Sequence, residues 1–393
     1  MIKENSMQVP KLRFKEFKLP YSKYQLSNYL IESKLKNKNL IYNKNDVLSV
    51  SGKFGVINQI ELQGRSFAGE KVNNYHIVET NDIVYTKSPL KLSPYGIIKV
   101  NNGISGIVST LYAVYHVLPN AIPKYIDFYF DYNLRLNKYL KPIVNIGAKH
   151  DMKISNEYVL TNYVSFPSIE EQTKIANFLS LIDRKIEIQE KLVENLKLYK
   201  RGLLQKVFSN NLGWKSAKLG DFLIPNDKIS VEDTSKYKKL TVKLNLQGLE
   251  ENIVKRTMLD TRPFYIRHQG EIIIGKQNYF NGSIAIISKK FDNYICSNAI
   301  MSFSISNANI YFIYYQISQS DYINKRSYMA NGTGQKELSE KDFLNFDIKI
   351  PNIEEQNQIA NLFSNLDRKI DFETKKLQDL KTYKKGLLQQ MFI

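Results

Sequence analysis

The chain has 393 residues, with 56 Lys and Arg against 38 Asp and Glu, which gives a formal net charge of +18. A hydrophobic content of 43% and an aromatic content of 12% exclude an intrinsically disordered chain, and the length predicts two or three domains. The single cysteine, Cys296, excludes an internal disulfide framework and a cysteine-built zinc site. The positive excess favours a polyanionic partner, nucleic acid first and an anionic membrane surface second.

No stretch approaches the ~20 uninterrupted apolar residues that cross a bilayer, and Met1–Pro10 has no apolar signal core. A cytoplasmic protein without a membrane partner is therefore expected. Residues 1–166 are predicted to form the first globular domain. Short β-branched runs at Gly96–Val100 and Gly106–Tyr115 predict strands of mixed, largely antiparallel sheets, and a helical pattern follows at Pro123–Leu140.

Residues 167–208 are predicted to form a long helix. Ser168 can cap its start, and Glu170 and Glu171 in the first turn face the positive end of the helix dipole. Apolar residues then recur at alternating spacings of four and three, which is the pattern of a heptad seam. The seam residues are Ile175, Leu179, Ile182, Ile186, Val193, Leu196, Leu203 and Val207.

Residues 209–350 are predicted to form a second domain of the same kind. Its strands are expected at Gly270–Ile274 and Ser283–Ile287, and its helix at Ile310–Arg326. This helix lies at the place that Pro123–Leu140 occupies in the first domain. The sequence therefore predicts two related domains of mixed α/β structure.

Residues 351–393 repeat the long helix. The 42 positions from Pro351 match those from Pro167 at a fixed offset of 184, with 23 identities and no gaps. The chain is therefore an internal duplication in the order domain, helix, domain, helix. Its fold class is α+β, with two mixed α/β domains separated by two long helices in a pseudo-twofold arrangement. The second seam consists of Ile359, Phe363, Leu366, Ile370, Leu377, Leu380, Leu387 and Met391.

Two helices that share one seam pattern are predicted to pair as a coiled coil, each about 60 Å long at 1.5 Å per residue. The alternative is that each helix only covers the core of its own domain. Both seams are interrupted at the same places, at Gln189 and Lys200 and at the matching residues of the second copy, Glu373 and Lys384. Gly202 and Gly386 fall inside the pattern and suggest a close backbone crossing or a helix end.

Each domain carries basic and amide side chains in glycine-rich turns. Arg, Lys, Gln and Asn read base edges in the major groove through paired hydrogen bonds, and they also bind phosphates. The alternative for each of them is an ordinary solvated loop residue. The candidates are Arg65, Lys87, Ser88 and Lys149 in the first domain and Arg262, Arg267, Lys276, Gln277, Asn278, Gln335 and Lys336 in the second.

The sequence lacks the motifs of DNA-modifying enzymes. No two prolines are adjacent, which excludes the Asn/Asp-Pro-Pro-aromatic motif of amino-methyltransferases, and no loop has the phosphate-binding form GxxxxGK[ST]. His76, His116, His150 and His268 show no spacing typical of a metal site or a catalytic pair, so each is expected to be structural or on the surface. The chain is therefore expected to hold no catalytic site and no metal.

The segments PSIEEQ from Pro167 and KRGLLQ from Lys200, with their copies from Pro351 and Lys384, resemble the two spacer helices of the specificity subunit of type I restriction-modification enzymes. The opening VPKLRF from Val9 is similar to a common start in that family. The resemblance covers the order of the whole chain. The domain sequences are expected to diverge, because each would read different bases.

This resemblance implies that each globular part is a target recognition domain that reads one half of a split, asymmetric site on double-stranded DNA. It implies that the helices pair in antiparallel fashion and set the number of unread base pairs between the halves. Two modification subunits would supply S-adenosylmethionine chemistry, and restriction subunits would add translocation and cleavage driven by ATP and Mg²⁺. These cofactors would belong to the partner subunits, and none to this chain.

Charge and helix length agree with a bipartite DNA reader. Residues 1–166 hold 22 Lys and Arg against 12 Asp and Glu, and residues 209–350 hold 19 against 14, so most of the excess lies in the two globular parts. A rod of about 60 Å spans on the order of 18 base pairs, so heads at its ends cannot read adjacent bases. Two alternatives stay open: a specificity subunit of a methylation-only or fused system, and a coiled-coil scaffold with two protein-binding heads.

Overall fold

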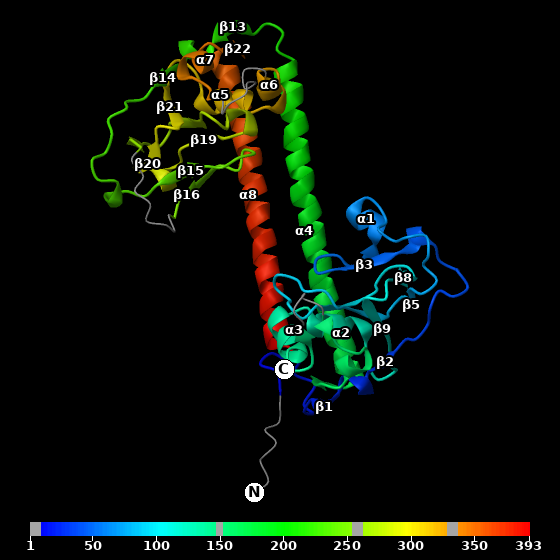
Figure 1. Ribbon diagram of the computed structural model, residues 1–393. Helices are drawn as coiled ribbons and strands as arrows, with labels where there is room; N and C mark the ends of the chain where they lie inside the picture. Colours follow the sequence, from blue (N-terminus) through cyan, green and yellow to red (C-terminus); the bar gives the residue numbers. More distant parts are fainter. Residues whose placement is uncertain (1–8, 147–151, 254–261, 328–336) are drawn as a thin grey trace. The chain divides into compact units, whose positions relative to one another are not determined.

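The computed structural model of the protein describes residues 9–146, 152–253, 262–327 and 337–393 (Figure 1). The chain divides into two compact units. The first unit consists of the residues up to Glu190 together with Lys376–Ile393, and the second unit is Lys191–Lys375. Each of the two long helices therefore contributes one part of its length to each unit. Among the described residues, no helix has the length and apolar character needed to cross a membrane.

The first unit combines short strands with short helices ahead of its long helix. Short 3₁₀ turns lie at Leu26–Asn28, Lys44–Asp46 and Glu157–Leu160. In chain order, the other elements are β1 (Ser22–Gln25), β2 (Leu30–Glu32), β3 (Leu48–Ser51), β4 (Gly55–Asn58), α1 (Gln59–Gln63), β5 (His76–Val78), β6 (Ile83–Thr86), β7 (Ile97–Val100), β8 (Gly106–Val108), β9 (Tyr112–Val117), α2 (Pro123–Phe130), α3 (Asn133–Leu140), β10 (Asn145–Ile146), β11 (Met152–Lys153), β12 (Tyr163–Phe166) and α4 (Ile169–Ser209).

The second unit repeats this plan. Its 3₁₀ turns lie at Leu219–Asp221, Thr234–Lys236, Tyr279–Asn281 and Lys289–Phe291. The other elements are β13 (Lys215–Lys218), β14 (Leu223–Pro225), β15 (Leu240–Val242), β16 (Leu249–Glu251), β17 (Phe264–Arg267), β18 (Ile272–Gly275), β19 (Ile284–Ile286), β20 (Tyr294–Ser297), β21 (Ile300–Ile305), α5 (Ile310–Ile317), α6 (Ser320–Asn324), α7 (Glu340–Leu344), β22 (Asp347–Ile350) and α8 (Ile353–Gln390).

The four-stranded sheets of the two units have the same strand order. The first runs β2-β9-β6-β7 and the second β14-β21-β18-β19, and the pairs within both sheets are antiparallel. The central strands β6 and β18 are buried along their whole length and start 189 residues apart. The fold class predicted from the sequence, α+β with an internal duplication, is confirmed by these matching sheets.

Some predicted elements are divided in the structure. The run Gly106–Tyr115 forms two strands, β8 and β9, because a turn closed by a hydrogen bond from Tyr112 N to Ser109 O separates them. The predicted helix Pro123–Leu140 forms α2 and α3. The start of α2 lies beside the first turns of α4, where Ile122 N donates to Gln172 Oε1, and α3 lies beside the end of α8 (Figure 1), where Arg135 Nη2 donates to Leu388 O. The predicted helix Ile310–Arg326 divides in the same way into α5 and α6. Such breaks depend on packing, which the apolar periodicity of the sequence does not reveal.

Each hydrophobic core includes segments of both long helices. In the first unit, Leu179 of α4 and Leu387 of α8 belong to the core that covers the β2-β9-β6-β7 sheet. In the second unit, Phe208 of α4 and Phe363 of α8 belong to the corresponding core, and their ring centroids lie 6.3 Å apart. The helices therefore cover the domain cores and also pack on each other, so the alternative that each helix only covers the core of its own domain is wrong.

The helices run antiparallel within each unit. In the first unit, Asp183 pairs with Lys384 and Glu190 pairs with Lys381, so rising numbers in α4 meet falling numbers in α8. In the second unit, Lys200 pairs with Asp367, and Phe208 lies beside Phe363. The predicted seam positions are all buried or half-buried in the structure.

The glutamine of the repeated PSIEEQ and PNIEEQ segments attaches each long helix to its domain. Gln172 is 1% exposed; its Oε1 accepts from Ile122 N at 3.1 Å, and its Nε2 donates to Pro167 O at 3.0 Å. Gln356 makes the same two bonds, from Asn309 N and to Pro351 O, both at 2.9 Å. Because Ile122 and Asn309 are the N-caps of α2 and α5, each glutamine joins the start of a long helix to the start of a domain helix.

The acidic pair of each segment contributes a second attachment. Glu171 is 1% exposed and accepts two hydrogen bonds from the guanidinium of Arg13, at 2.8 and 2.7 Å. Glu355 accepts from the indole Nε1 of Trp214 at 2.9 Å. The opening VPKLRF segment is thus held against α4 through Arg13, and Leu12 N donates to Gln390 O near the end of α8.

Gly202 and Gly386 lie inside α4 and α8, so neither residue ends a helix. Among the described atoms, a Cβ built at Gly202 meets nothing within 4 Å, and one at Gly386 meets only Gln390 Nε2 at 4.0 Å. The expectation of a close backbone crossing or a helix end is therefore wrong.

Replacing either glycine with alanine should stabilise the protein. Alanine has the higher helix propensity and loses less backbone entropy on folding, so Gly202→Ala and Gly386→Ala should each raise the free energy of unfolding by about 0.5–1 kcal/mol. Urea denaturation followed by circular dichroism would measure the change. A loss of stability in either variant would show that the position needs a glycine for a reason other than space.

Candidate nucleic-acid interface

Two of the predicted clusters lie at equivalent places in the two units. Lys87 and Ser88 follow β6, and Lys276 and Gln277 follow the matching strand β18. Both lysines are half-buried, whereas Ser88 and Gln277 are exposed. Burial lowers the pKa of Lys87, an effect that Glu32 partly offsets. The same strand end thus presents a lysine followed by a different polar residue in each domain.

The three candidate residues after β18 differ in the contacts that hold their side chains. Lys276 Nζ lies 3.7 Å from a carboxylate oxygen of Glu337. Asn278 has a role within the turn after β18, because its Oδ1 accepts from Asn281 Nδ2 at 3.1 Å and its N donates to Gly275 O. Gln277 is therefore the member of this cluster whose exposed side chain is most easily changed without altering the turn.

Arg65 is exposed in the segment after α1, and its guanidinium lies 4.6 Å from the ring centre of Phe67, which is 57% exposed. A similar pair was missed in the sequence: Lys53 Nζ lies 4.9 Å from the ring centre of Phe54, which is 56% exposed at the tip of the β3–β4 hairpin. A lysine next to an aromatic residue in a glycine-flanked turn was the available signal. Such pairs offer a cation and a ring face to a nucleotide.

The candidate arginines of the second unit lie at opposite ends of β17. Arg262 precedes the strand and is exposed, whereas Arg267 ends it and is 2% exposed. The expectation that Arg267 lies in a solvated turn is therefore wrong. Lys149, Gln335 and Lys336 lie outside the described residues.

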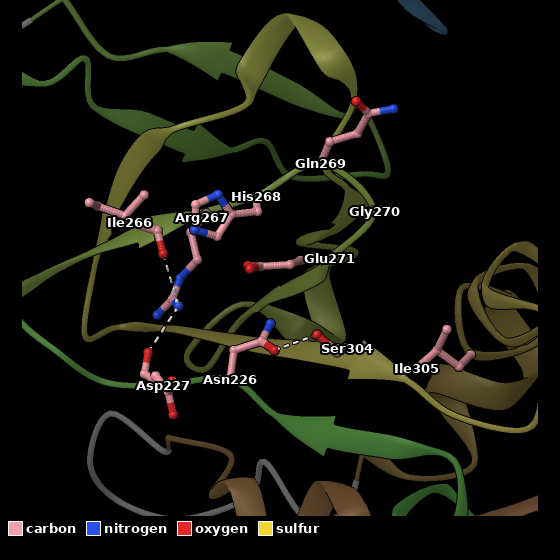
Figure 2. Close-up of a pocket in the computed structure, with 10 residues that line it drawn as sticks. All are labelled: Asn226, Asp227, Ile266, Arg267, His268, Gln269, Gly270, Glu271, Ser304 and Ile305. Atoms are coloured by element: carbon pink, nitrogen blue, oxygen red, sulfur yellow. Dashed lines mark hydrogen bonds between the residues drawn. The ribbon is translucent and has the colours of Figure 1, made fainter.

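Arg267 lines a cavity of about 440 Å³ that is bounded by the ends of β14, β17 and β21. Its Nη1 donates to the carbonyl oxygens of Asp227 and Ile266, at 3.4 and 3.3 Å, and its Nε has no partner among the described residues. Figure 2 shows the Glu271 carboxylate extending from the facing turn toward the Arg267 side chain. Glu271 is 8% exposed and accepts from Ser302 Oγ at 2.7 Å. The cavity therefore offers a donor and an acceptor to a small polar group.

The equivalent turn of the first unit carries different chemistry. Asp82 occupies the position of Glu271, and its Oδ1 lies 2.7 Å from His116 Nδ1. Burial raises the pKa of Asp82, although hydrogen bonds from the Glu79 backbone and from His116 act in the opposite direction. Ligand atoms of Glu79, Asp82 and His116 lie within 4.8 Å of one another. The sequence did not reveal this group, because Glu79 and Asp82 lie in the turn between β5 and β6 whereas His116 belongs to β9, which pairs with β6 only in the folded sheet. The expectation of no metal stays a prediction.

A cluster of charges joins the first domain to both long helices. Lys384 Nζ of α8 lies 2.7 Å from Asp183 Oδ1 of α4 and 3.2 Å from Asp131 Oδ2 at the end of α2, and Lys99 of β7 also pairs with Asp131. Burial alone would raise the pKa of Asp131, but the ammonium groups of Lys99 and Lys384 outweigh it and hold that pKa below its ordinary value. Asp131 is therefore ionised and paired.

Comparison with known proteins finds similarity to one family. Residues 211–382 match the model of the type I restriction modification DNA specificity domain. The chain is 27% identical over 252 residues to the putative type I restriction enzyme MjaX specificity subunit of Methanocaldococcus jannaschii, covering 57% of each protein. It is 24% identical over 296 residues to the MjaVIII specificity subunit of the same organism, covering 67% of this chain and 68% of that one. The chain is therefore similar to type I specificity subunits, and residues 211–382 match their DNA specificity domain.

Solved structures of type I systems share the fold of this chain. The S subunit of a type I restriction-modification system from M. genitalium superposes with a TM-score of 0.62 at 16% identity, over 98% of this chain and 99% of that one. A second solved structure, described as the structural basis of complex assembly and conformational transition of the type I R-M system, gives a TM-score of 0.53 at 13% identity. The match covers 96% of this chain and 99% of that one. The match to the first curated relative spans little more than half of that protein's length.

Acid should weaken the first unit through Asp131. A carboxylate whose folded pKa lies below its unfolded value stabilises the folded state above the unfolded pKa of about 3.9, and this stabilisation is lost as the pH falls through the folded pKa. The wild type should therefore lose more stability than Asp131→Asn when the pH is lowered from about 5 to about 3. Urea midpoints at the two pH values measure the difference. Glu61→Gln, an exposed change of equal charge, is the control and should follow the wild type.

Proposed function

We propose that the chain is the DNA-recognition subunit of a type I restriction-modification system, with each domain reading one half of a bipartite site. The observation that carries the proposal is the duplicated scaffold with unlike polar side chains at the same place. After β6 the chain presents Lys87 and Ser88, and after β18 it presents Lys276 and Gln277. Two heads of one fold with different readout residues suit an asymmetric target.

The long helices connect the two reading heads and set the distance between the half sites. Each helix is anchored at its start by Gln172 or Gln356, whose buried amide leaves little freedom between helix and domain. A bipartite target with a fixed number of unread base pairs follows from this construction. The positive charge of the globular parts supplies the attraction to the DNA backbone.

The chemistry of the system belongs to partner subunits in this proposal. Two modification subunits bind S-adenosylmethionine and methylate one adenine in each half site, and restriction subunits use ATP and Mg²⁺ for translocation and cleavage. The chain itself positions the duplex in the cytoplasm of its host and holds no catalytic residue. A methylation-only or fused system would use this subunit in the same way, and the genes beside its own would separate the two cases.

Changing the cluster after β18 should affect one half site only. Lys276→Ala/Gln277→Ala keeps Asn278 and its turn and should cost about 1–3 kcal/mol of discrimination per lost base contact. Mapping methylated adenines in the host genome defines both half sites, and duplexes mutated in one half at a time then report on each head by gel shift. Lys341→Ala on α7, which removes the same charge, should leave both half-site preferences unchanged. An equal loss at both halves would contradict the assignment of this cluster to one head.

Salt dependence should separate phosphate contacts from base contacts. Affinity for specific duplex should fall steeply with rising salt, because bound phosphates release counterions. If Lys276 contacts a phosphate, Lys276→Ala should lower the slope of log K against log salt by about 1, whereas Gln277→Ala should leave the slope unchanged. Fluorescence anisotropy over a salt series measures both. Affinity that is independent of salt would favour the alternative of a scaffold with protein-binding heads.

A further inference from the structure

The two copies of the long helix exchange an ion pair. Lys200 and Lys384 occupy the same position of the repeat, 184 residues apart, and so do Asp183 and Asp367. In the first unit, Lys384 of α8 pairs with Asp183 of α4 at 2.7 Å. In the second unit, Lys200 of α4 pairs with Asp367 of α8. Each lysine thus meets the aspartate of the other copy. These lysines are two of the four residues that interrupt the apolar seams in the sequence.

Each lysine also contacts the helix of the neighbouring domain. Lys384 Nζ lies 3.2 Å from Asp131 Oδ2 and 5.4 Å from the ring centre of Phe128 in α2. Lys200 Nζ lies 5.1 Å from the ring centre of Tyr315 in α5, and the Tyr315 hydroxyl donates to Asp367 Oδ2 at 2.7 Å. Phe128 and Tyr315 are both the sixth residue of their helices. Each lysine therefore joins three elements, α4, α8 and one domain helix.

These pairs are shielded from water more than an ordinary surface pair. The side chains of Lys200 and Lys384 are 20% and 18% exposed and those of Asp367 and Asp183 are 37% and 36% exposed, whereas those of the interhelical pair Glu190 and Lys381 are 42% and 45% exposed. Removing the aspartate leaves a largely covered ammonium group without its partner, which costs more than breaking a pair whose two side chains are both exposed. The exchanged pairs therefore penalise any arrangement that separates them.

A seam of leucine and isoleucine does not by itself define one register. Shifting one helix by a heptad brings similar apolar residues into similar places, and polar residues within a seam are the features that specify register. In each unit the lysine and its aspartate meet in one register only, because a shift by one turn moves them apart by about 5.4 Å. The interruptions at Lys200 and Lys384 are thus points where register is defined.

We propose that Lys200, Asp367, Lys384 and Asp183 are positioning residues. Their two ion pairs fix the register of α4 against α8 and the position of each domain helix, α2 or α5, against the long helices. They thereby determine the spacing between half sites that the subunit accepts. This inference rests on the proposed function, because a spacing exists only if both heads read DNA.

The test compares spacing preference between variants of the full-length chain. Each protein selects duplexes from a random-sequence pool, and sequencing of the bound fraction returns the half-site motifs and the distance between them. The variants are Lys200→Asp, Asp367→Lys and the charge-swapped double variant Lys200→Asp/Asp367→Lys. Lys381→Asp, which breaks the exposed pair with Glu190, is the matched control.

The wild type and the control should select both motifs at one spacing. Each single variant should select the same two motifs at several spacings, including shorter and longer ones, and the charge-swapped double variant should return to one spacing. The corresponding swap Asp183→Lys/Lys384→Asp should restore a single spacing less well, because Asp131 would then face an aspartate at position 384. Helical circular dichroism and melting show that each variant is folded. If a single variant does not fold, Lys200→Met replaces it.

The outcomes separate the inference from the proposed function. If the wild type enriches no pair of motifs, the proposed function fails. If the wild type enriches two motifs at one spacing and folded single variants keep that one spacing, the positioning role is overturned while the proposed function stands. Broadened spacing with unchanged motifs in the single variants, together with recovery in the double variant, supports the inference.

Discussion

The structure depends on the completion of each domain core by a helix end from the other half of the duplication. Phe208, at the end of α4, lies 5.4 Å from Phe312 of α5 in the second unit. Phe392, just after α8, lies 5.2 Å from Tyr125 of α2 in the first unit. Tyr125 and Phe312 are both the third residue of their helices, so the two contacts are equivalent. Each core therefore includes residues from the long helix of the other repeat.

This constraint acts differently on the helices and on the heads. The helix segments must satisfy two cores, two anchoring glutamines and two exchanged ion pairs at once, which leaves few positions free to change. The heads need only keep the order β2-β9-β6-β7 or β14-β21-β18-β19 and its buried central strand. Residues beyond the strand ends carry no such demand, so Lys87 with Ser88 and Lys276 with Gln277 can differ on a common scaffold.

Much of the architecture could be predicted because the same helix pattern occurs twice in the sequence at a fixed offset. The seam, the helix starts and the domain order all follow from periodicity and from the offset of 184. The roles of Gln172 and Arg13 could not, because their partners Ile122 and Glu171 are distant in the sequence and meet only through folding. Arg267 was misjudged for a related reason: a glycine-rich context indicates a turn, but the strands around β17 decide that its side chain points inward.

Polar residues interrupt the apolar seam of each long helix at equivalent positions. Lys200 and Lys384 find their aspartates, and Asp131 is held ionised by two ammonium groups despite its burial. A purely apolar seam would pack as tightly in several registers, whereas a shielded charge pair is satisfied in one. In the proposed function the two domains read half sites at one spacing, so uniqueness of register matters more than added stability, and the charges lie where helix meets helix and helix meets domain.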